Sequence, residues 1–437
     1  MMKLSGKFLA LCALVALAMA MLVPIGAFAA GGKEVKKDGP ITLTVWDFKY
    51  GDPRTGAVMK KIDDAFMAAN PGIIIQHIAQ PEESYYQLLG TAAAARKGPD
   101  IGLFHVGAKH QDFDEYLVDL GKYSASVKSS FTEASVLKGS DKSGKKWEIY
   151  PMTMQGMGIY YNKAAFRKAG LDPDKAPKTG VEFLAACEKL KAAGIIPIEA
   201  GQSYTTDFLF RCFVANVFAD KTPSIGTSAV SFTDPGFVAA ASFVKTVIDK
   251  GYVNPAGKDR PYFMEAIDLF ASGQGGFFVG LLSDVAHWKS FGDGIGKADV
   301  GYFPTINLPE IKNKDIQASQ AAGIGYGIFT WSAEPSAAAR YLEFTSNGPG
   351  AEIFSSELGA LSPAKGLDTS KMGYSALTDI NKYLGKTADD YLNLSGFQGG
   401  LEDMAHRLQD QAFILGSLSP KAYAEAMDKA AAEMRVK

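Results

Sequence analysis

The chain has 437 residues, 47% hydrophobic and 21% charged, a composition typical of a globular protein with more than one domain. Its 45 basic and 47 acidic residues give a formal net charge of −2, which offers no electrostatic basis for binding nucleic acid. We therefore expect no nucleic-acid partner, and two or three globular units.

The N-terminus has the pattern of a secretory signal peptide over residues 1–29. A short lysine-containing segment precedes an apolar run at 8–28, which ends in an A-x-A cleavage pattern. We expect cleavage after Ala29 or Ala30, followed by a flexible polar tether over 30–40. An uncleaved membrane anchor is the alternative, because the run approaches the ~20 residues that a spanning helix needs.

The cysteines refine this localisation. Cys12 lies inside the apolar run and not at its end, so the cleavage site offers no cysteine for lipid attachment. We therefore expect a soluble periplasmic or secreted protein. Cys187 and Cys212 are the cysteines of the mature chain, and either a disulfide or two buried thiols is compatible with them.

After the tether, strand and helix patterns alternate, which is the rhythm of an α/β sheet. Val58, Ile62 and Phe66 recur at helical spacing, which predicts an amphipathic helix. The expected segments are a strand at 41–48, a helix at 57–70, a strand at 72–80, a helix at 84–98 and a strand at 101–106.

A second α/β series follows residue 155. Asn162 is a candidate cap for the short helix after its first strand, and Phe183, Cys187 and Leu190 share one helix face. From about residue 372 the chain reads as helical. The expected strands are 156–162, 195–200, 275–280, 299–304 and 323–331, and the expected helices are 163–170, 181–194, 236–251 and 262–272.

Motifs for catalysis or metal binding are weak. Residues 139–146 fit the spacing of a phosphate-binding loop, but Lys146 replaces the Ser or Thr that would hold magnesium, so a lysine-rich turn is favoured. His105 and His110 are five apart and do not share a helix face, so we expect no metal and no cofactor. A glycosidase-like carboxylate pair is spatial and stays open from sequence alone.

Polar and aromatic residues gather where the predicted strands end, and ligands of open α/β sheets bind at the carboxyl ends of strands. Aromatic faces stack on sugar rings, while Asp, Gln and His bind hydroxyl groups. The candidate ligand-binding residues are Trp46, Asp47, Phe104, His105, Gln155, Gln202, Tyr204, Asp207 and Asp284, with no catalytic residue among them.

The segment 143–198 resembles the extracellular solute-binding proteins of ABC sugar importers, the family of maltose-binding protein. It carries G-K-K-W-E-I-Y-P, Y-Y-N-K, K-A-G-L, P-K-T and L-K-A-A-G in the family's order. GPDIGLFH, FASGQGGFFVG and GYGIFTWSAEPSAAARYLEFTS match further family segments. One departure is that Leu281 and Leu282 follow Gly280, where many members have Trp, which puts a long oligosaccharide groove in doubt.

The resemblance implies a two-lobed α/β periplasmic binding protein with a ligand cleft, hinge-crossing strands and a helical C-terminal region. One lobe would comprise 41–150 plus 320–367, and the other 151–319 plus 368–437, with crossings near 151–158 and 306–320. The implied function is reversible binding of a sugar or polyol by a monomer and delivery to membrane permease subunits. The alternatives are a secreted carbohydrate-active hydrolase and a sugar-binding input to a sensor kinase.

Overall fold

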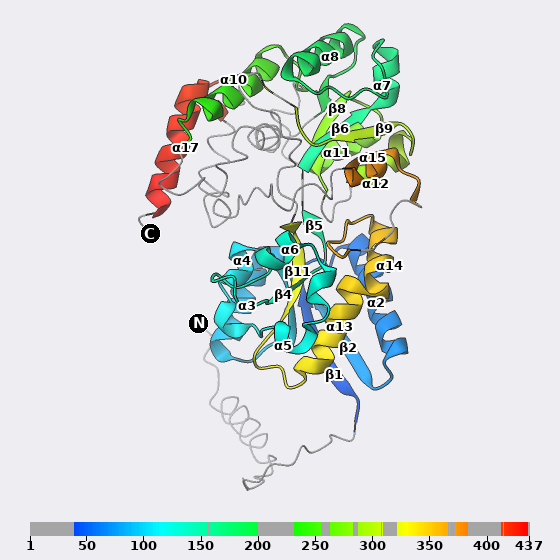
Figure 1. The fold of residues 1–437 in the computed structure, drawn as a ribbon, viewed down its shortest axis with the longest axis vertical. Helices are drawn as coiled ribbons and strands as arrows, with labels where there is room; N and C mark the ends of the chain where they lie inside the picture. The colour runs from blue at the N-terminus through cyan, green and yellow to red at the C-terminus, as the bar shows by residue number, and fades with distance from the viewer. Residues whose placement is uncertain are drawn as a thin grey trace, which may run out of the picture. The chain divides into compact units, whose positions relative to one another are not determined.

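The computed structural model describes residues 39–155, 157–199, 231–254, 263–282, 287–306, 308, 321–365, 367, 372–382, 412–413 and 415–435. Two α/β sheets organise this part of the chain (Figure 1). Both sheets belong to the unit Pro40–Lys437. Among the helices within these ranges, none has both the length and the apolar character that a membrane crossing requires.

The first sheet has five strands in the order β2-β1-β3-β11-β4. Strand β1 pairs in parallel with β2 and β3, whereas β11 runs antiparallel to β3 and β4. The three strands predicted for the first part of the chain are thereby confirmed. Their bounds are β1 Ile41–Asp47, β2 Ile73–Ala79, β3 Ile101–His105, β4 Ile149–Pro151 and β11 Ile324–Ile328.

Helices pack against this sheet through the apolar faces that the sequence predicts. Val58, Ile62 and Phe66 of α2 are at most 6% exposed, which confirms that helix. Helix α14 contacts both α2 and α13. The helical elements that accompany the sheet are α2 Pro53–Ala69, η1 Glu82–Ser84, α3 Tyr85–Ala95, α4 Ala108–Gln111, η2 Asp114–Tyr116, α5 Gly121–Ser124, η3 Lys128–Ser130, α6 Glu133–Lys138, α13 Pro335–Asn347 and α14 Pro349–Leu358.

The second sheet has four strands in the order β7-β8-β6-β9, with β6 antiparallel to both of its neighbours. Strand β7 is parallel to β8. The strands are β6 Met157–Asn162, β7 Ile198–Glu199, β8 Phe277–Leu281 and β9 Val300–Phe303. The helices are α7 Lys163–Lys168, α8 Gly180–Ala192, α10 Pro235–Asp249, α11 Phe263–Ala271, α12 His287–Ile295, α15 Ser375–Asn381 and α17 Pro420–Arg435.

The helices α7 and α8 begin with side-chain caps. Asn162 accepts a hydrogen bond from the amide of Ala165, 3.0 Å away, which confirms the predicted cap of α7. At α8, Thr179 and Glu182 form a reciprocal capping box. Its apolar face is buried as predicted, with Phe183, Cys187 and Leu190 at 0% exposure.

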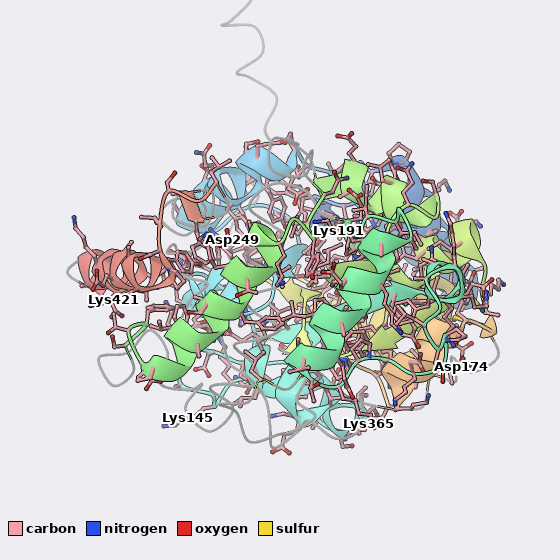
Figure 2. The ribbon with its side chains drawn as sticks, turned by 90° about the horizontal axis from the view of Figure 1, so that it is seen from above. Lys145, Asp174, Lys191, Asp249, Lys365 and Lys421 are labelled. Carbon is pink, nitrogen blue, oxygen red and sulfur yellow. The ribbon has the colours of Figure 1, made fainter. Side chains whose placement is uncertain are left out.

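Charged side chains lie on the outer faces of these helices. Lys191 of α8 and Asp249 of α10 are both exposed and lie near the neighbouring ends of these helices (Figure 2). Lys191 Nζ donates to the backbone carbonyl of Lys250, 2.7 Å away, which ties α8 to the end of α10. The long stem of such a lysine covers apolar surface while its ammonium group reaches a polar partner.

A short two-stranded ladder joins distant parts of the chain. Strand β5 Met154–Gln155 pairs antiparallel with β10 Ala321–Ala322. The predicted first crossing at 151–158 falls on the segment from β4 to β6, whereas most of the second, at 306–320, lies outside the described residues. The proposed lobe boundaries stay predictions. Cys187 is a buried free thiol and Cys212 lies outside the described residues, so the choice between a disulfide and two thiols is not tested.

The contribution of the capping box of α8 to stability can be tested directly. Thr179→Ala removes the acceptor for the Glu182 amide and is expected to lower the free energy of unfolding by about 1 kcal/mol. Val181→Ala, on the same helix at 70% exposure, is the control, and we expect a change of less than about 0.5 kcal/mol. Urea unfolding of both variants measures the difference, and equal effects would contradict the cap.

Candidate functional site

The candidate site lies at one edge of the five-stranded sheet. Because β1, β2 and β3 are parallel, their carboxyl ends, at Asp47, Ala79 and His105, share that edge. The antiparallel register of β11 places Ile324 opposite His105, and Gly325 lies opposite Pro151 at the end of β4. The chain therefore continues from β4 toward β5 at the same edge where the candidate residues gather.

An aromatic group occupies the edge after β1 and β3. The ring of Phe48 stacks on the imidazole of His105, with centroids 4.7 Å apart and planes 14° apart. Tyr86 of α3 lies beside them, and Lys109 Nζ lies 5.5 Å from the centre of its ring. Phe48 is only 5% exposed, so it is the half-buried rings of Tyr86 and His105 that are suited to stacking on the C–H face of a sugar.

Two hydrogen bonds join His105 to Tyr86. Its backbone N–H donates to the hydroxyl of Tyr86 at 2.9 Å, and the same hydroxyl lies 2.9 Å from His105 Nδ1. The two contacts hold the imidazole of His105 against the Tyr86 side chain at the edge of the sheet.

Behind this aromatic group lies a buried charge array, which we define as Asp47, His77 and Asp63. His77 Nε2 lies 3.2 Å from Asp47 Oδ2, and its Nδ1 lies 2.9 Å from Asp63 Oδ2. The three side chains are only 1%, 1% and 5% exposed. Two tyrosine hydroxyls complete it at 2.5 Å, from Tyr326 to Asp47 and from Tyr341 to Asp63.

The array keeps His77 charged. Burial opposes the imidazolium, but hydrogen bonds and charge from Asp47 and Asp63 outweigh burial and raise the pKa of His77 from 6.5 to about 9. Burial likewise acts to raise the pKa of Asp47, yet its bonds to His77 and Tyr326 hold that pKa below the ordinary 3.8. A positive imidazolium between two carboxylates is therefore the stable form at neutral pH.

The predicted ligand-binding residues at the edge of the five-stranded sheet differ in burial. Trp46 and His105 are half-buried, whereas Asp47 and Phe104 are 1% and 0% exposed. Phe104 packs in the core near Phe113 and Phe329, at centroid distances of 5.6 and 6.0 Å. Asp47 bonds within the array and to the backbone of its own loop.

The other predicted residues are not described in the same detail. Gln155 lies in β5, and the structure describes its backbone pairing with Ala321 and not its side chain. Gln202, Tyr204, Asp207 and Asp284 lie outside the described residues. Ligand contact by all nine predicted residues stays a prediction.

Sequence reasoning missed His77, Asp63 and Tyr86. His77 stands in an apolar strand and Asp63 on the buried side of an amphipathic helix, where charged residues are rare unless paired. That burial pattern was the available signal. Their pairing partners come from β1, β11 and α13, which no local pattern connects.

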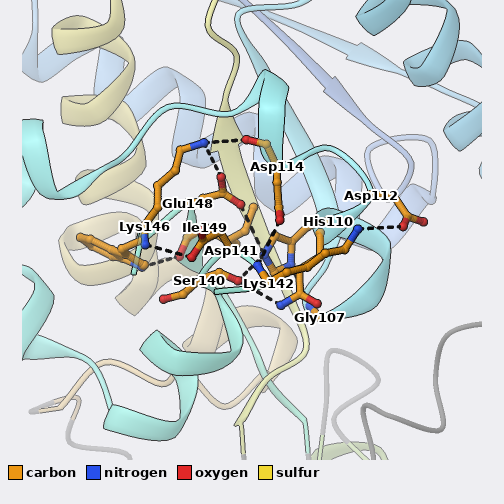
Figure 3. A network of polar contacts seen from close by, with 12 residues as sticks. Gly107, His110, Asp112, Asp114, Ser140, Asp141, Lys142, Lys146, Glu148 and Ile149 are labelled. Carbon is orange, nitrogen blue, oxygen red and sulfur yellow. Dashed lines mark hydrogen bonds and ion pairs between the residues drawn. The ribbon is translucent and has the colours of Figure 1, made fainter. Parts of the chain in front are cut away.

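A second buried polar cluster, formed by His110, Asp114, Lys146 and Glu148, lies under the hairpin before β4 (Figure 3). Lys146 Nζ lies 2.6 Å from Glu148 Oε1 and donates to the backbone carbonyl of Asp114. Burial nevertheless raises the pKa of Glu148 to about 8, with Asp114 adding to the effect. Glu148 is 0% exposed, so this carboxyl pair offers no surface at which a substrate could be cleaved.

This cluster does not fit a metal bound through His110. His110, Asp114 and Glu148 offer ligand atoms within 4.8 Å of one another. However, the N–H of Gly107 donates to His110 Nδ1 at 2.8 Å, and His110 Nε2 lies 3.1 Å from the Ser140 carbonyl. A neutral His110 therefore carries its proton on Nε2, where a metal would have to bind. Burial lowers the pKa of His110 to about 4, so the neutral form holds.

The comparisons with known proteins define the class. The family model of the bacterial extracellular solute-binding proteins matches residues 61–379. The chain belongs to this family. The resemblance of the 143–198 segment is thereby confirmed, together with an α/β binding-protein fold.

Individual relatives match shorter stretches. A binding protein of Brucella abortus is 26% identical over 261 residues, which cover 55% of this chain and 57% of that protein. The sn-glycerol-3-phosphate-binding periplasmic protein UgpB of the same organism is 48% identical over 174 residues, 37% of this chain and 38% of that one. The matches thus span little more than half of the first curated relatives.

A solved structure extends the likeness over almost the whole chain. A chitin oligosaccharide binding protein superimposes with a TM-score of 0.72 over 91% of this chain and 100% of its own, at 22% identity. At this identity the likeness establishes the two-lobed fold. The ligand of that protein does not transfer with the fold.

The buried ionisable groups predict a pH-dependent stability. Folded His77 keeps its proton up to about pH 9 while the unfolded residue loses it near 6.5, so stability falls as pH rises between these values. Glu148, with its folded pKa near 8, lowers stability with rising pH between about 4.5 and 8. His110 and His287, with lowered pKa values, act in the opposite sense below about 6.5.

The variant Glu148→Gln separates the two contributions because it removes one titration. In that variant we expect the free energy of unfolding to fall by about 2–3 kcal/mol from pH 7 to pH 9, mainly through His77, with the buried Cys187 thiol, whose pKa is raised by burial, adding in the same direction. Urea unfolding at half-unit pH steps measures the slope. A flat profile over this range would show that His77 is neutral in the folded chain.

Proposed function

We propose that this protein is the substrate-binding component of an ABC importer, which binds a sugar or polyol outside the cytoplasmic membrane and delivers it to the permease subunits. The observation that carries the proposal is the family match over residues 61–379. The fold similarity over 91% of the chain to a protein that binds chitin oligosaccharides supports a carbohydrate ligand.

The chemistry of the sheet edge supports the same ligand class. His105 offers a half-buried flat face backed by the buried ring of Phe48, and Trp46 lies near the end of β1, two residues before Phe48. Hydroxyl-rich ligands need such faces together with hydrogen-bonding groups. We propose Trp46 and His105 as contacts from this unit, whereas the burial of Asp47 and Phe104 favours positioning and packing roles for them.

The crossing and the second α/β series would supply the remaining ligand contacts. We propose that the hydroxyl groups of the ligand bind Gln155 from the crossing. We propose the same role for residues from the loops after the strands of the second α/β series, namely Gln202, Tyr204, Asp207 and Asp284. Hinge closure over the ligand would exclude water and strengthen each hydrogen bond to it.

The ligand is proposed to be a monosaccharide, a short oligosaccharide or a glycerol-based polyol. The 48% identity to UgpB over 174 residues favours including sn-glycerol-3-phosphate. We further propose a monomer in the periplasm, with the signal peptide cleaved after Ala29 or Ala30, that releases its ligand chemically unchanged.

Ligand identification tests the proposal. The mature chain is screened by thermal shift against maltose, N,N′-diacetylchitobiose, sn-glycerol-3-phosphate and a wider sugar library. A ligand present at about 100 times its dissociation constant is expected to add about 2.7 kcal/mol of stability and raise the melting temperature. Chromatography of the recovered ligand is the companion measurement, and hydrolysis by the pure protein would establish an enzyme instead.

The placement of the site is tested with two tryptophans. Trp46→Ala is expected to weaken binding of the best ligand by at least about tenfold, because removing a stacking anchor costs on the order of 1–3 kcal/mol. Trp331→Ala is the matched control, since Trp331 is also half-buried but stacks on Phe329 beyond the opposite end of β11. Calorimetry compares the two, and equal losses would move the site away from Trp46.

A further inference from the structure

The two oxygens of Asp47 have different partners. Oδ1 accepts the backbone N–H groups of Lys49 and Tyr50, the latter at 3.0 Å, and so fixes the turn that follows β1. Oδ2 accepts from His77 and from the hydroxyl of Tyr326. The same carboxylate therefore belongs to the buried charge array and to the loop over residues 48–50, which we call the β1 loop.

The β1 loop is also attached through its rings. Tyr50 stacks on the imidazole of His77, with centroids 4.0 Å apart and planes 16° apart. Phe48 stacks on His105 from the other strand end. The position of the loop relative to β3 thus depends on the array beneath one ring and on His105 beneath the other.

Asp63 is the useful contrast to Asp47. It accepts from the same imidazole, at 2.9 Å, and from an equivalent tyrosine hydroxyl, at 2.5 Å from Tyr341. It lies on α2 and has no hydrogen bond to the β1 loop among those of the described residues. The two carboxylates are therefore matched in their array contacts and differ in their contact with the loop.

We propose that Asp47 is a positioning residue for ligand binding: it does not contact the ligand but holds the β1 loop, with Phe48 and Tyr50, in the geometry that the ligand meets. His77 keeps the Asp47 carboxylate in place from below. This inference rests on the proposed function, because it requires that the β1 loop borders the bound sugar or polyol.

The Asp47 carboxylate keeps this orientation because any other orientation would leave a buried charge unpaired. A buried carboxylate must be paired and fully hydrogen-bonded, so Asp47 cannot turn toward the cleft without leaving His77 charged and unpaired on one side. The same constraint keeps Oδ1 directed at the two loop amides. The loop is thus preorganised before any ligand arrives, which lowers the ordering cost of binding.

The test compares Asp47→Ala with Asp63→Ala in the mature chain. Both variants remove one array carboxylate, so we expect similar losses of melting temperature. Dissociation constants for maltose, N,N′-diacetylchitobiose and sn-glycerol-3-phosphate are measured by calorimetry for each. We expect binding of the ligand that the parent binds to weaken at least tenfold in Asp47→Ala and less than threefold in Asp63→Ala. Equal weakening at equal stability would overturn the proposal.

A milder pair serves if either alanine variant does not fold. Tyr326→Phe removes one hydrogen bond to Asp47, and Tyr341→Phe removes the equivalent bond to Asp63. We expect about threefold weaker binding in the first and no measurable change in the second, at similar melting temperatures. The reverse order, or no difference between them, would overturn the proposal.

Amide hydrogen exchange separates this inference from the proposed function, since it needs no ligand. The Lys49 and Tyr50 amides are expected to be protected in the parent and in Asp63→Ala, and to exchange at least tenfold faster in Asp47→Ala. Unchanged protection in Asp47→Ala would refute the positioning role. Failure of the parent to bind any library member, with this exchange pattern intact, would refute the proposed function alone.

Discussion

The architecture around the five-stranded sheet depends on one buried interaction, the imidazolium of His77 between the carboxylates of Asp47 and Asp63. Each charge alone would be costly to bury, and together with two tyrosine hydroxyls they leave no array carboxylate without a donor. The array joins β1, β2, α2, β11 and α13, elements far apart in the sequence. It therefore fixes the sheet edge and the loop at which binding is proposed.

The second buried cluster shows why the same residue types behave differently. Burial lowers the pKa of His110 to about 4 and so holds it neutral, while the Gly107 amide donates to one ring nitrogen and the Ser140 carbonyl faces the other. Glu148 meets a single ammonium from Lys146 and a second carboxyl group from Asp114, and it is held protonated up to about pH 8. Burial favours the neutral imidazole in both places, and only His77, with a carboxylate at each ring nitrogen, keeps its charge against burial.

The topology of the five-stranded sheet explains the position of the proposed binding site. Parallel strands bring their carboxyl ends together, and the antiparallel β11 and β4 place the start of the crossing at that same edge. The loop after β1 lies at this edge and is held to the array by the hydrogen bonds of the Lys49 and Tyr50 amides to Asp47.

The sequence by itself determined the α/β class, the family and most strands and helices, because periodicity, caps and family motifs are local. The helical spacing of Val58, Ile62 and Phe66 alone predicts α2. The position of Asn162 directly before a helical segment predicts that it is an N-cap. Only the tertiary structure decided that Asp47 faces inward and that His77 is its partner. Residues 47, 63 and 77 lie on three elements, and their side chains meet only when β1 and β2 pair and α2 packs across them.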